Sequence, residues 1–398
     1  MNSDMRKIKV VYIADMGIEG GATKSMIELV SNLKENFNIY PIVLTSKKCI
    51  LNDLLNMYEI ENFAIGHSAF MHGAPDSWWK KPIKWVLYGI YYVISYHSSY
   101  KKAMNVIDWS TVDLIHTNVA RDDIGMRISK KFEIPNMCHI REFAELDFNC
   151  WSYRPKYIRY LSNNVDKFIA ISETVKNYWV SKGLPSDKIS VIYNGVDSKK
   201  IKKADRINWT IDKTIKLVIV GGVIPNKGQW QAIEALQYLP NEILPYVQLD
   251  IIGKVSTSYK KKLISQIKNP RVIEQINFLG AKDNVYDCLR DYHIGLMCSK
   301  AEAFGRVTVE YMNAGLAVIA TNTGANSELI KNGVNGLIYP YNDTLALAEL
   351  IQNLYNNRKM LIKISSAGEE FAGKFFTKEV NAENIYSTYK SLLTSFDM

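Results

Sequence analysis

Short apolar segments of strand length alternate with amphipathic segments along most of the chain. The first apolar segment, Ile8–Ala14, is followed by a glycine-bearing loop and then by a helical pattern with Met26, Leu29 and Leu33 on one face. Apolar residues three or four positions apart share one face of a helix, whereas short continuous apolar runs are typical of strands buried on both faces. The alternation therefore predicts an α/β protein built from βαβ units, with parallel sheets flanked by helices.

The predicted strands fall into two series separated by a polar, lysine-rich stretch. The first series comprises Ile8–Ala14, Ile39–Thr45, Val112–His116, Phe168–Ile171 and Ile189–Tyr193. The second comprises Ile215–Gly221, Val247–Gly253, Ile294–Cys298 and Ala317–Thr321. The stretch between them, Ser198–Asp212, has no clear apolar period, so we expect it to be a linker.

A chain of 398 residues is long for a single hydrophobic core, which favours two domains. We predict an N-terminal Rossmann-like domain of residues 1–200 and a C-terminal Rossmann-like domain of residues 201–376. The last segment, residues 377–398, is expected to form a helix that packs back on the N-terminal domain. Ligands of such sheets bind beyond the carboxyl ends of the strands, so the chemistry is expected in the loops that follow them.

Composition narrows the class of protein. Hydrophobic residues make up 47% of the chain and charged residues 22%, which is typical of a globular protein. The five cysteines have no CxxC or metal-ligand spacing, so we expect buried thiols in a reduced compartment. We expect neither a secretory signal nor a membrane-spanning segment, and hence a cytoplasmic location. The net charge of +9 suits an anionic partner, or it only keeps the protein soluble. No nucleic-acid-binding module is recognisable, so no nucleic-acid partner is expected.

The most informative motif lies between the last two predicted strands and reads SKAEAFGRVTVEYMNAGLAVIA. Its glutamates, Glu302 and Glu310, are separated by seven residues. The Phe304–Gly305 turn places backbone amides at the start of a helix, where the helix dipole favours phosphate. Two carboxylates in this setting can accept hydrogen bonds from sugar and ribose hydroxyls. The alternative is a pair of solvated surface glutamates.

Further motifs occur in order along the chain: GGATKSMIEL, AISETVKNYW, VIYNGVD, NKGQWQAIEAL, LDIIG, INFLG and TGANSELIKNGVNGLIY. Together with the glutamate pair, this series resembles the retaining glycosyltransferases of family 4, whose signature is E-x7-E. The resemblance implies a GT-B fold, in which two Rossmann-like domains face each other across a cleft. It also implies an acceptor in the N-terminal half, a nucleotide-sugar donor in the C-terminal half, and no metal or other cofactor.

The resemblance assigns roles to individual residues of the C-terminal half. Glu302 would contact the donor sugar and Glu310 the ribose, while Lys227 would bind the diphosphate and stabilise it as it departs. The backbone of four consecutive residues would bind the sugar and diphosphate: Phe304, Gly305, Arg306 and Val307. The alternative for Lys227 is a position at a helix start without a ligand.

One residue departs from the family pattern. The family usually has an arginine after the first strand of this half, where this chain has Gly222 in the sequence Val-Gly-Gly. The expected clamp of two cations on the diphosphate is therefore reduced to Lys227. Arg306 is a possible replacement, but we expect it to face solvent.

In the N-terminal half, the loop after the first strand would face the donor diphosphate through three residues, Gly20, Gly21 and Ala22. Its spacing from Gly17 does not form a dinucleotide-binding fingerprint, and no P-loop sequence is present. Asn118 occupies the place of the second histidine in the family's His-x-His pattern, two residues after His116.

A later strand end of the same half presents His139, Arg141 and Glu142. We take Asn118 and Arg141 as catalytic candidates alongside Glu302 and Lys227. None of the N-terminal residues is a clear general base. Relatives are usually described with a same-face mechanism in which the leaving phosphate helps to deprotonate the acceptor.

Residues 77–102 form a stretch rich in tryptophan, tyrosine and lysine. Its apolar core, from Trp85 to Tyr96, is too short to span a bilayer. Such a helix can lie in the membrane interface, with aromatic rings at headgroup level and lysines on anionic lipid. The alternative is a core helix. We predict peripheral membrane contact at the inner face of the cell membrane.

The predicted function is therefore retaining transfer of a hexose or N-acetylhexosamine, with UDP as the favoured nucleotide. The predicted acceptor is a lipid-linked glycan in bacterial surface polysaccharide synthesis. A catalytically weak or silent GT-B partner protein, which binds glycan or stabilises another transferase, is the alternative. An epimerase is disfavoured by the order of the motifs.

Overall fold

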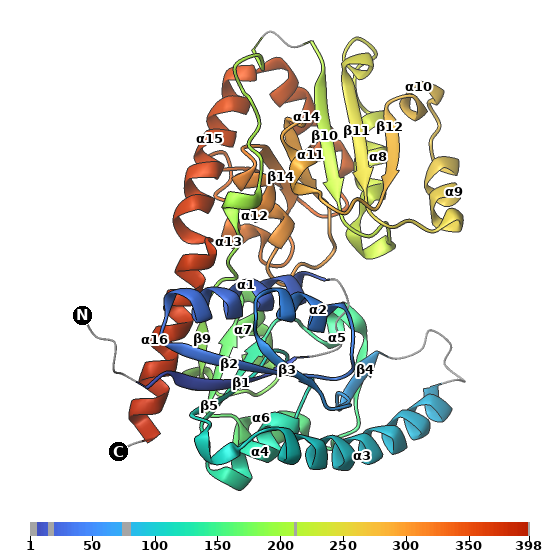
Figure 1. The fold of residues 1–398 in the computed structure, drawn as a ribbon. Helices are drawn as coiled ribbons and strands as arrows, with labels where there is room; N and C mark the ends of the chain where they lie inside the picture. The colour runs from blue at the N-terminus through green and yellow to red at the C-terminus, as the bar shows by residue number, and fades with distance from the viewer. Residues whose placement is uncertain (1–5, 15–19, 74–80, 211–212, 397–398) are drawn as a thin grey trace, which may run out of the picture. The chain divides into compact units, whose positions relative to one another are not determined.

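The computed structural model describes residues 6–14, 20–73, 81–210 and 213–396 and contains two compact units (Figure 1). Unit 1 comprises Met1–Gly195 together with Lys378–Met398, and unit 2 comprises Val196–Thr377. Each unit has its own parallel sheet and its own hydrophobic core. The predicted α/β class with two Rossmann-like sheets is confirmed.

The sheet of unit 1 has seven parallel strands. Their spatial order is β3 (Glu61–Ala64), β2 (Ile39–Thr45), β1 (Ile8–Ala14), β5 (Leu114–Thr117), β6 (Asn136–Ile140), β8 (Lys167–Ala170) and β9 (Ile189–Val191). The strands β2 and β3 follow on one side of β1, and the chain then returns to form β5 on the other side of β1. The reversal between β1 and β5 is the topological switch point, where ligands of such sheets bind.

Two apolar cores cover the two faces of this sheet, because successive side chains of a strand point to opposite faces. Val10 and Tyr12 of β1 pack with α1 (Gly21–Asn36), α2 (Ile50–Met57) and α16 (Lys378–Phe396). Val11 and Ile13 pack on the opposite face with α3 (Lys81–Val106) and α4 (Ile124–Phe132). The remaining elements of the unit are α5 (Glu145–Phe148), α6 (Tyr157–Asn164), α7 (Glu173–Ser181) and the antiparallel pair β4 (Met71–Gly73) and β7 (Cys150–Ser152).

The sheet of unit 2 has six parallel strands. Their order is β12 (Ile276–Gly280), β11 (Val247–Ile252), β10 (Ile215–Val220), β13 (Ile294–Met297), β14 (Ala317–Thr321) and β15 (Leu337–Tyr339). The helices are α8 (Gln229–Gln237), α9 (Thr257–Ser265), α10 (Pro270–Ile273), α11 (Tyr286–Leu289), α12 (Arg306–Asn313), α13 (Asn326–Leu329), α14 (Thr344–Asn356) and α15 (Arg358–Phe375). The switch point lies between β10 and β13.

The segment expected as a linker, Ser198–Asp212, is packed on unit 2 over its described residues. Trp209 is buried in the core of the unit, and Ile201 is buried as well. Arg206 donates to Gly315 O over 3.2 Å. Isolated apolar anchors of this kind leave no periodic pattern in a sequence, which explains why the stretch resembles a linker.

The thiols are less uniformly buried than expected. Cys138, Cys150 and Cys298 are buried, but Cys49 and Cys288 are partly exposed, and none of the five forms a disulfide.

Candidate functional site

Lys227 and Glu302 meet at the switch point of unit 2. Lys227 lies in the loop after β10 and Glu302 in the loop after β13, and the two strands pair in parallel, so both loops emerge at one edge of the sheet. Lys227 Nζ lies 2.8 Å from Glu302 Oε2, and the side chains are 37% and 17% exposed. The structure therefore brings together two predicted site residues in an ion pair that solvent can reach.

The turn that carries Lys227 is fixed by backbone contacts. Gly228 has φ +67°, and a Cβ at this position would lie 2.0 Å from Cys298 O, so only glycine fits. Gln231 Nε2 donates to the same carbonyl over 2.8 Å. Lys300 N donates to Asn226 O over 2.9 Å, which ties the loop after β13 to the turn.

The loop after β14 supports Glu302 from the other side. Gly324 has φ +58°, and a Cβ there would lie 2.1 Å from Glu302 O. Ala325 N donates to that carbonyl over 2.8 Å. Gly324 was not predicted as a site residue. It lies in TGANSELIKNGVNGLIY, a motif that contributed to the family resemblance.

Glu310 lies in a buried polar cluster on α12. Arg306 Nε contacts Glu310 Oε1 over 2.9 Å, one helical turn away. Tyr286 OH of α11 donates to the same oxygen over 2.9 Å, and Arg306 Nη2 donates to Tyr286 OH over 3.2 Å. The expectation that Arg306 faces solvent is wrong, because its side chain is buried against Glu310. Tyr286 could not be predicted from the sequence, because it is a single tyrosine far from the motif.

The start of α12 adjoins this cluster. Gly305 is the N-cap of the helix, Phe304 before it is buried, and Val307 in the first turn is partly exposed. The ring of Phe304 contacts that of Phe376 edge to face, with centroids 5.9 Å apart. Among the described residues, no group of three or more histidine, cysteine, aspartate or glutamate side chains could hold a metal ion.

In unit 1, the candidates Asn118 and Arg141 are in direct contact. Arg141 Nε donates to Asn118 Oδ1 over 2.8 Å and to its carbonyl over 3.2 Å. Arg141 Nη1 donates to Asn194 Oδ1 over 2.6 Å. All three side chains are buried and follow β5, β6 and β9 respectively.

A histidine pair lies beside Arg141. His116 Nε2 lies 2.6 Å from His139 Nδ1, and His116 Nδ1 contacts Tyr389 OH of α16. Tyr389 OH lies 3.0 Å from Tyr12 OH, and Arg141 Nη2 lies 3.4 Å from His139 Nδ1. Burial, reinforced by the Arg141 cation, lowers the pKa of His116 to about 3 and the pKa of His139 well below its usual range. Both rings are therefore neutral at pH 7.

The other residues singled out in unit 1 have separate surroundings. Glu142 is paired with Arg121, and its carbonyl accepts a hydrogen bond of 2.9 Å from Trp179 Nε1. Gly20 is the N-cap of α1, and Gly21 and Ala22 are exposed in its first turn. Gly17 lies outside the described residues.

Helix α3 exposes an unusually apolar surface. Its outer face carries Ile83, Leu87, Ile90 and Ile94, which are 55–65% exposed. The inner face places Tyr92, Ser95, Ser99 and Ala103 against the unit. Figure 1 shows the N-terminal half of α3 extending beyond α4. The core-helix alternative is wrong for this half, since nearly every described side chain from Pro82 to Tyr91 is exposed. Residues 77–80 lie outside the described part.

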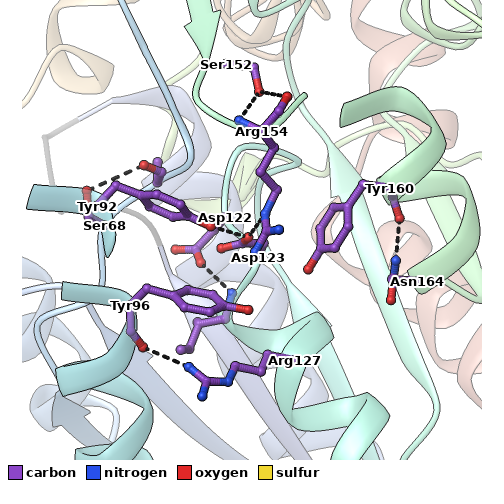
Figure 2. Close-up of polar contacts among 12 residues, drawn as sticks. Ser68, Tyr92, Tyr96, Asp122, Asp123, Arg127, Ser152, Arg154, Tyr160 and Asn164 are labelled. Atoms are coloured by element: carbon purple, nitrogen blue, oxygen red, sulfur yellow. Dashed lines mark hydrogen bonds and ion pairs between the residues drawn. The ribbon is translucent and has the colours of Figure 1, made fainter. Parts of the chain in front are cut away.

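Buried polar contacts anchor the inner face of α3 (Figure 2). Tyr92 OH donates to Asp123 Oδ2 over 2.6 Å, and Arg154 Nε pairs with the same oxygen. Burial raises the pKa of Asp123 to about 6, although Arg154 favours the ionised form. The Arg127 guanidinium lies 4.7 Å from the ring centre of Tyr96 and 3.8 Å from that of Tyr100. These contacts hold α3 with its apolar face outward.

Within the described residues, no helix has the length and apolar character needed to cross a membrane.

Two family models match the chain. Residues 201–371 match glycosyl transferases group 1, and residues 65–200 match glycosyltransferase family 4. An uncharacterized glycosyltransferase of Methanocaldococcus jannaschii is 30% identical over 72% of this chain and 77% of its own length. CapM, a capsular polysaccharide biosynthesis glycosyltransferase of Staphylococcus aureus, is 23% identical over 60% of this chain and 66% of its own length.

A solved structure has the same fold. Anabaena HepE, crystallised in complex with UDP and glucose, superimposes with a TM-score of 0.75 at 20% identity. The match covers 96% of this chain and 100% of that one.

Proposed function

The chain belongs to the group 1 glycosyltransferases of family 4, and on that basis we propose that it transfers a hexose or N-acetylhexosamine from a UDP-sugar to a lipid-linked glycan with retention. The observation that carries this proposal is the ion pair of Lys227 and Glu302 at the carboxyl edge of the unit 2 sheet, with Glu302 in the loop that leads into α12. The HepE structure, a complex with UDP and glucose, supports the choice of nucleotide.

The donor site we propose uses the residues of unit 2 in three ways. Lys227 is held beside the Glu302 carboxylate, so a diphosphate that binds here meets a cation that is already positioned. Glu310 receives hydrogen bonds from Arg306 and Tyr286, which orient its carboxylate toward the ribose hydroxyls. The start of α12, with Phe304, Gly305, Arg306 and Val307, offers backbone amides to the phosphates.

The reaction we propose proceeds on one face of the sugar. The bond from the anomeric carbon to the β-phosphate oxygen breaks, and the acceptor oxygen forms its bond on the same face. The acceptor proton passes to the departing phosphate. Lys227 stabilises the charge that develops on that phosphate, and Glu302 contacts the sugar as positive charge develops. No metal takes part in this scheme.

We propose that the acceptor lies at a membrane, and the surface of α3 supports this. The helix contains no acidic residue, its outer face is apolar, and Lys84, Lys101 and Lys102 are exposed along it. Apolar side chains can enter the headgroup boundary while each nearby lysine contributes about 1 kcal/mol on anionic lipid. We therefore propose an acceptor at the cytoplasmic face of the cell membrane, in surface polysaccharide synthesis as for CapM.

A screen of nucleotide-sugars tests the reaction. The purified protein is incubated with UDP-, GDP- and ADP-sugars, with and without extracted lipid-linked glycans and in EDTA, and products are analysed by mass spectrometry and anomeric NMR. We expect hydrolysis or transfer from a UDP-sugar with retained configuration. An inverted product would refute the retaining mechanism. No turnover of any donor would favour the silent-partner alternative, which the glycine at position 222 supports.

Sedimentation with anionic liposomes tests the membrane contact. Wild-type protein should pellet at low salt and less at high salt, because salt screens the lysine contribution. A variant with serine at Ile83, Leu87, Ile90 and Ile94 should remain in solution.

The matched control changes four exposed apolar residues outside α3 to serine: Met57, Ile207, Val334 and Leu345. The control should pellet like the wild type. If both variants partition equally, α3 is not the contact surface.

A further inference from the structure

The side chains beside Arg141 form a chain of hydrogen bonds. Which group donates and which accepts in each of them follows from the chemistry of the side chains. A guanidinium only donates, and Arg141 Nη2 lies 3.4 Å from His139 Nδ1, so that nitrogen presents its lone pair. The proton of the neutral His139 ring is therefore on Nε2. His116 Nε2 must then donate to His139 Nδ1, across the 2.6 Å contact between them.

The donor and the acceptor of the next hydrogen bond, which reaches α16, follow from the same proton position. Because the proton of His116 is on Nε2, its Nδ1 accepts, and the Tyr389 hydroxyl donates to it. Tyr389 then accepts from Tyr12 OH over 3.0 Å. The chain thus runs from Tyr12 through Tyr389 and His116 to His139. His139 Nε2 has no hydrogen-bond partner among the described residues, consistent with its place at the end of the chain.

We propose that Tyr389, His116 and His139 are positioning residues that fix Arg141 for the reaction. The inference rests on the proposed function in treating Arg141 as a group that meets the acceptor or donor. In the opposite proton arrangement, an N–H on His139 Nδ1 would face an N–H of Arg141 at 3.4 Å, and the two donors would repel. The Tyr389 hydroxyl can donate or accept, so it is compatible with either arrangement, and in the arrangement that Arg141 favours it donates to His116 Nδ1.

This inference gives α16 a function besides packing. Ala382, Ile385 and Tyr389 of α16 lie in the same core as α1 and β1, so the helix delivers the Tyr389 hydroxyl to the centre of unit 1. Loss of that hydroxyl leaves His116 Nδ1 buried without a donor, which is unfavourable. Moving the proton to Nδ1 would not relieve this, because the N–H would then be buried without an acceptor. The His116 ring therefore loses one of the two contacts that hold it against His139.

Ring-nitrogen NMR tests the proton positions directly. The protein has six histidines, so isotope labelling of histidine gives few ring-nitrogen signals. The variants His116→Gln and His139→Gln then assign the signals of the two rings. At pH 7 we expect the proton on Nε2 in both rings of the wild type. Tyr389→Phe should leave the protons on Nε2 but shift the His116 Nδ1 resonance toward that of a lone pair without a hydrogen bond. Tyr12→Phe should not shift it, because Tyr389 still donates to His116.

The control is Tyr386→Phe, on the same helix and partly exposed against Phe37. A proton on Nδ1 of either ring in the wild type would overturn the inference, and so would a His116 Nδ1 resonance that Tyr389→Phe leaves unchanged. The wild-type spectrum needs no variant and no donor, so this result is independent of the proposed function.

Turnover kinetics distinguish a positioning role of Tyr389 from a purely structural one. With the donor identified in the screen, Tyr389→Phe should lower kcat about tenfold while the donor KM stays within about twofold. Tyr386→Phe should match the wild type in both. An unchanged kcat in a Tyr389→Phe protein whose His116 Nδ1 resonance has shifted would overturn the positioning role. Absence of turnover in the wild type would instead refute the proposed function, and the tautomer result would stand.

Discussion

The two units place their candidate residues in opposite electrostatic settings. In unit 2, Lys227 and Glu302 form an ion pair that is partly open to solvent. In unit 1, Asn118 and Arg141 are buried, and the histidines beside them are neutral. The sheets are alike and both clusters lie beside a switch point, so the difference comes from the side chains.

We infer from this difference two ways of contributing to the proposed reaction. An accessible cation can exchange its carboxylate for a ligand phosphate, so we expect the unit 2 residues to act by direct contact. A buried network in a region of low polarity cannot exchange partners without a penalty, so we expect it to hold a geometry. Substitutions in unit 2 should then change ligand contacts, while substitutions in the unit 1 network should change its hydrogen bonds and stability.

The largest effect is expected at Glu302. Glu302→Gln keeps the size of the side chain but removes its charge from the reacting sugar. We expect turnover to fall by on the order of 100-fold or more, with UDP affinity nearly unchanged. Steady-state kinetics and a UDP titration measure the two quantities. Glu349→Gln, exposed on α14, is the control and should behave as the wild type. If Glu302→Gln turned over at the wild-type rate, Glu302 would not be part of the reacting site.

An intermediate effect is expected from pH at His116. The unfolded chain takes up a proton near pH 6.5, whereas the folded ring, with a pKa of about 3, does not. The stability that His116 contributes is therefore present above pH 6.5 and is lost as pH falls from 6.5 toward 3. Relative to His116→Gln, the wild type should lose about 1.4 kcal/mol of unfolding free energy per pH unit in this window.

Urea unfolding at pH 7, 6 and 5 measures this difference. His97→Gln, at an exposed position of α3, should show much less pH dependence relative to the wild type. A pH-independent difference between the wild type and His116→Gln would mean that the buried ring is not kept neutral, and the contrast between the units would fail.

The smallest effect is expected from restoring the missing arginine. Gly222 is exposed, and a Cβ there would meet no atom within 4 Å, so Gly222→Arg fits without rearrangement. A second cation near Lys227 should tighten UDP binding by up to about fivefold, as expected for a partly exposed pair. Gly373→Arg, at an equally open position, is the control. Weaker binding in Gly222→Arg would show that the diphosphate does not lie near this loop.

The residues proposed for the unit 2 site were identifiable from the sequence because they lie in short, ordered motifs that follow strands. Glu302 and Glu310 lie within one motif, and Lys227 lies within another. Tyr286 was missed because it reaches the site from a separate helix, and the burial of Arg306 depends on that tyrosine and Glu310.

Unit 1 was less predictable for a physical reason. His116 and Tyr389 are 273 positions apart, and they meet only because the last helix returns to unit 1. No periodicity or spacing along the chain encodes that contact. The strands themselves were predictable, since Ile8–Ala14, Ile39–Thr45 and Ala317–Thr321 have the predicted bounds. Length alone does not explain why β3 and β15 were missed, since they have four and three residues, as do β8 and β9, which were predicted.

A calorimetric titration of UDP into the wild type and Lys227→Ala tests the central claim, that unit 2 holds a nucleotide-sugar through Lys227. We expect UDP to bind the wild type and to bind Lys227→Ala about tenfold or more weakly, because a charge-assisted contact to phosphate is lost. Lys359→Ala, exposed on α15, should retain the wild-type affinity. A preference for GDP or ADP would change only the base. Equal affinity of the wild type and Lys227→Ala, or no binding of UDP, GDP and ADP to the wild type, would contradict the donor site.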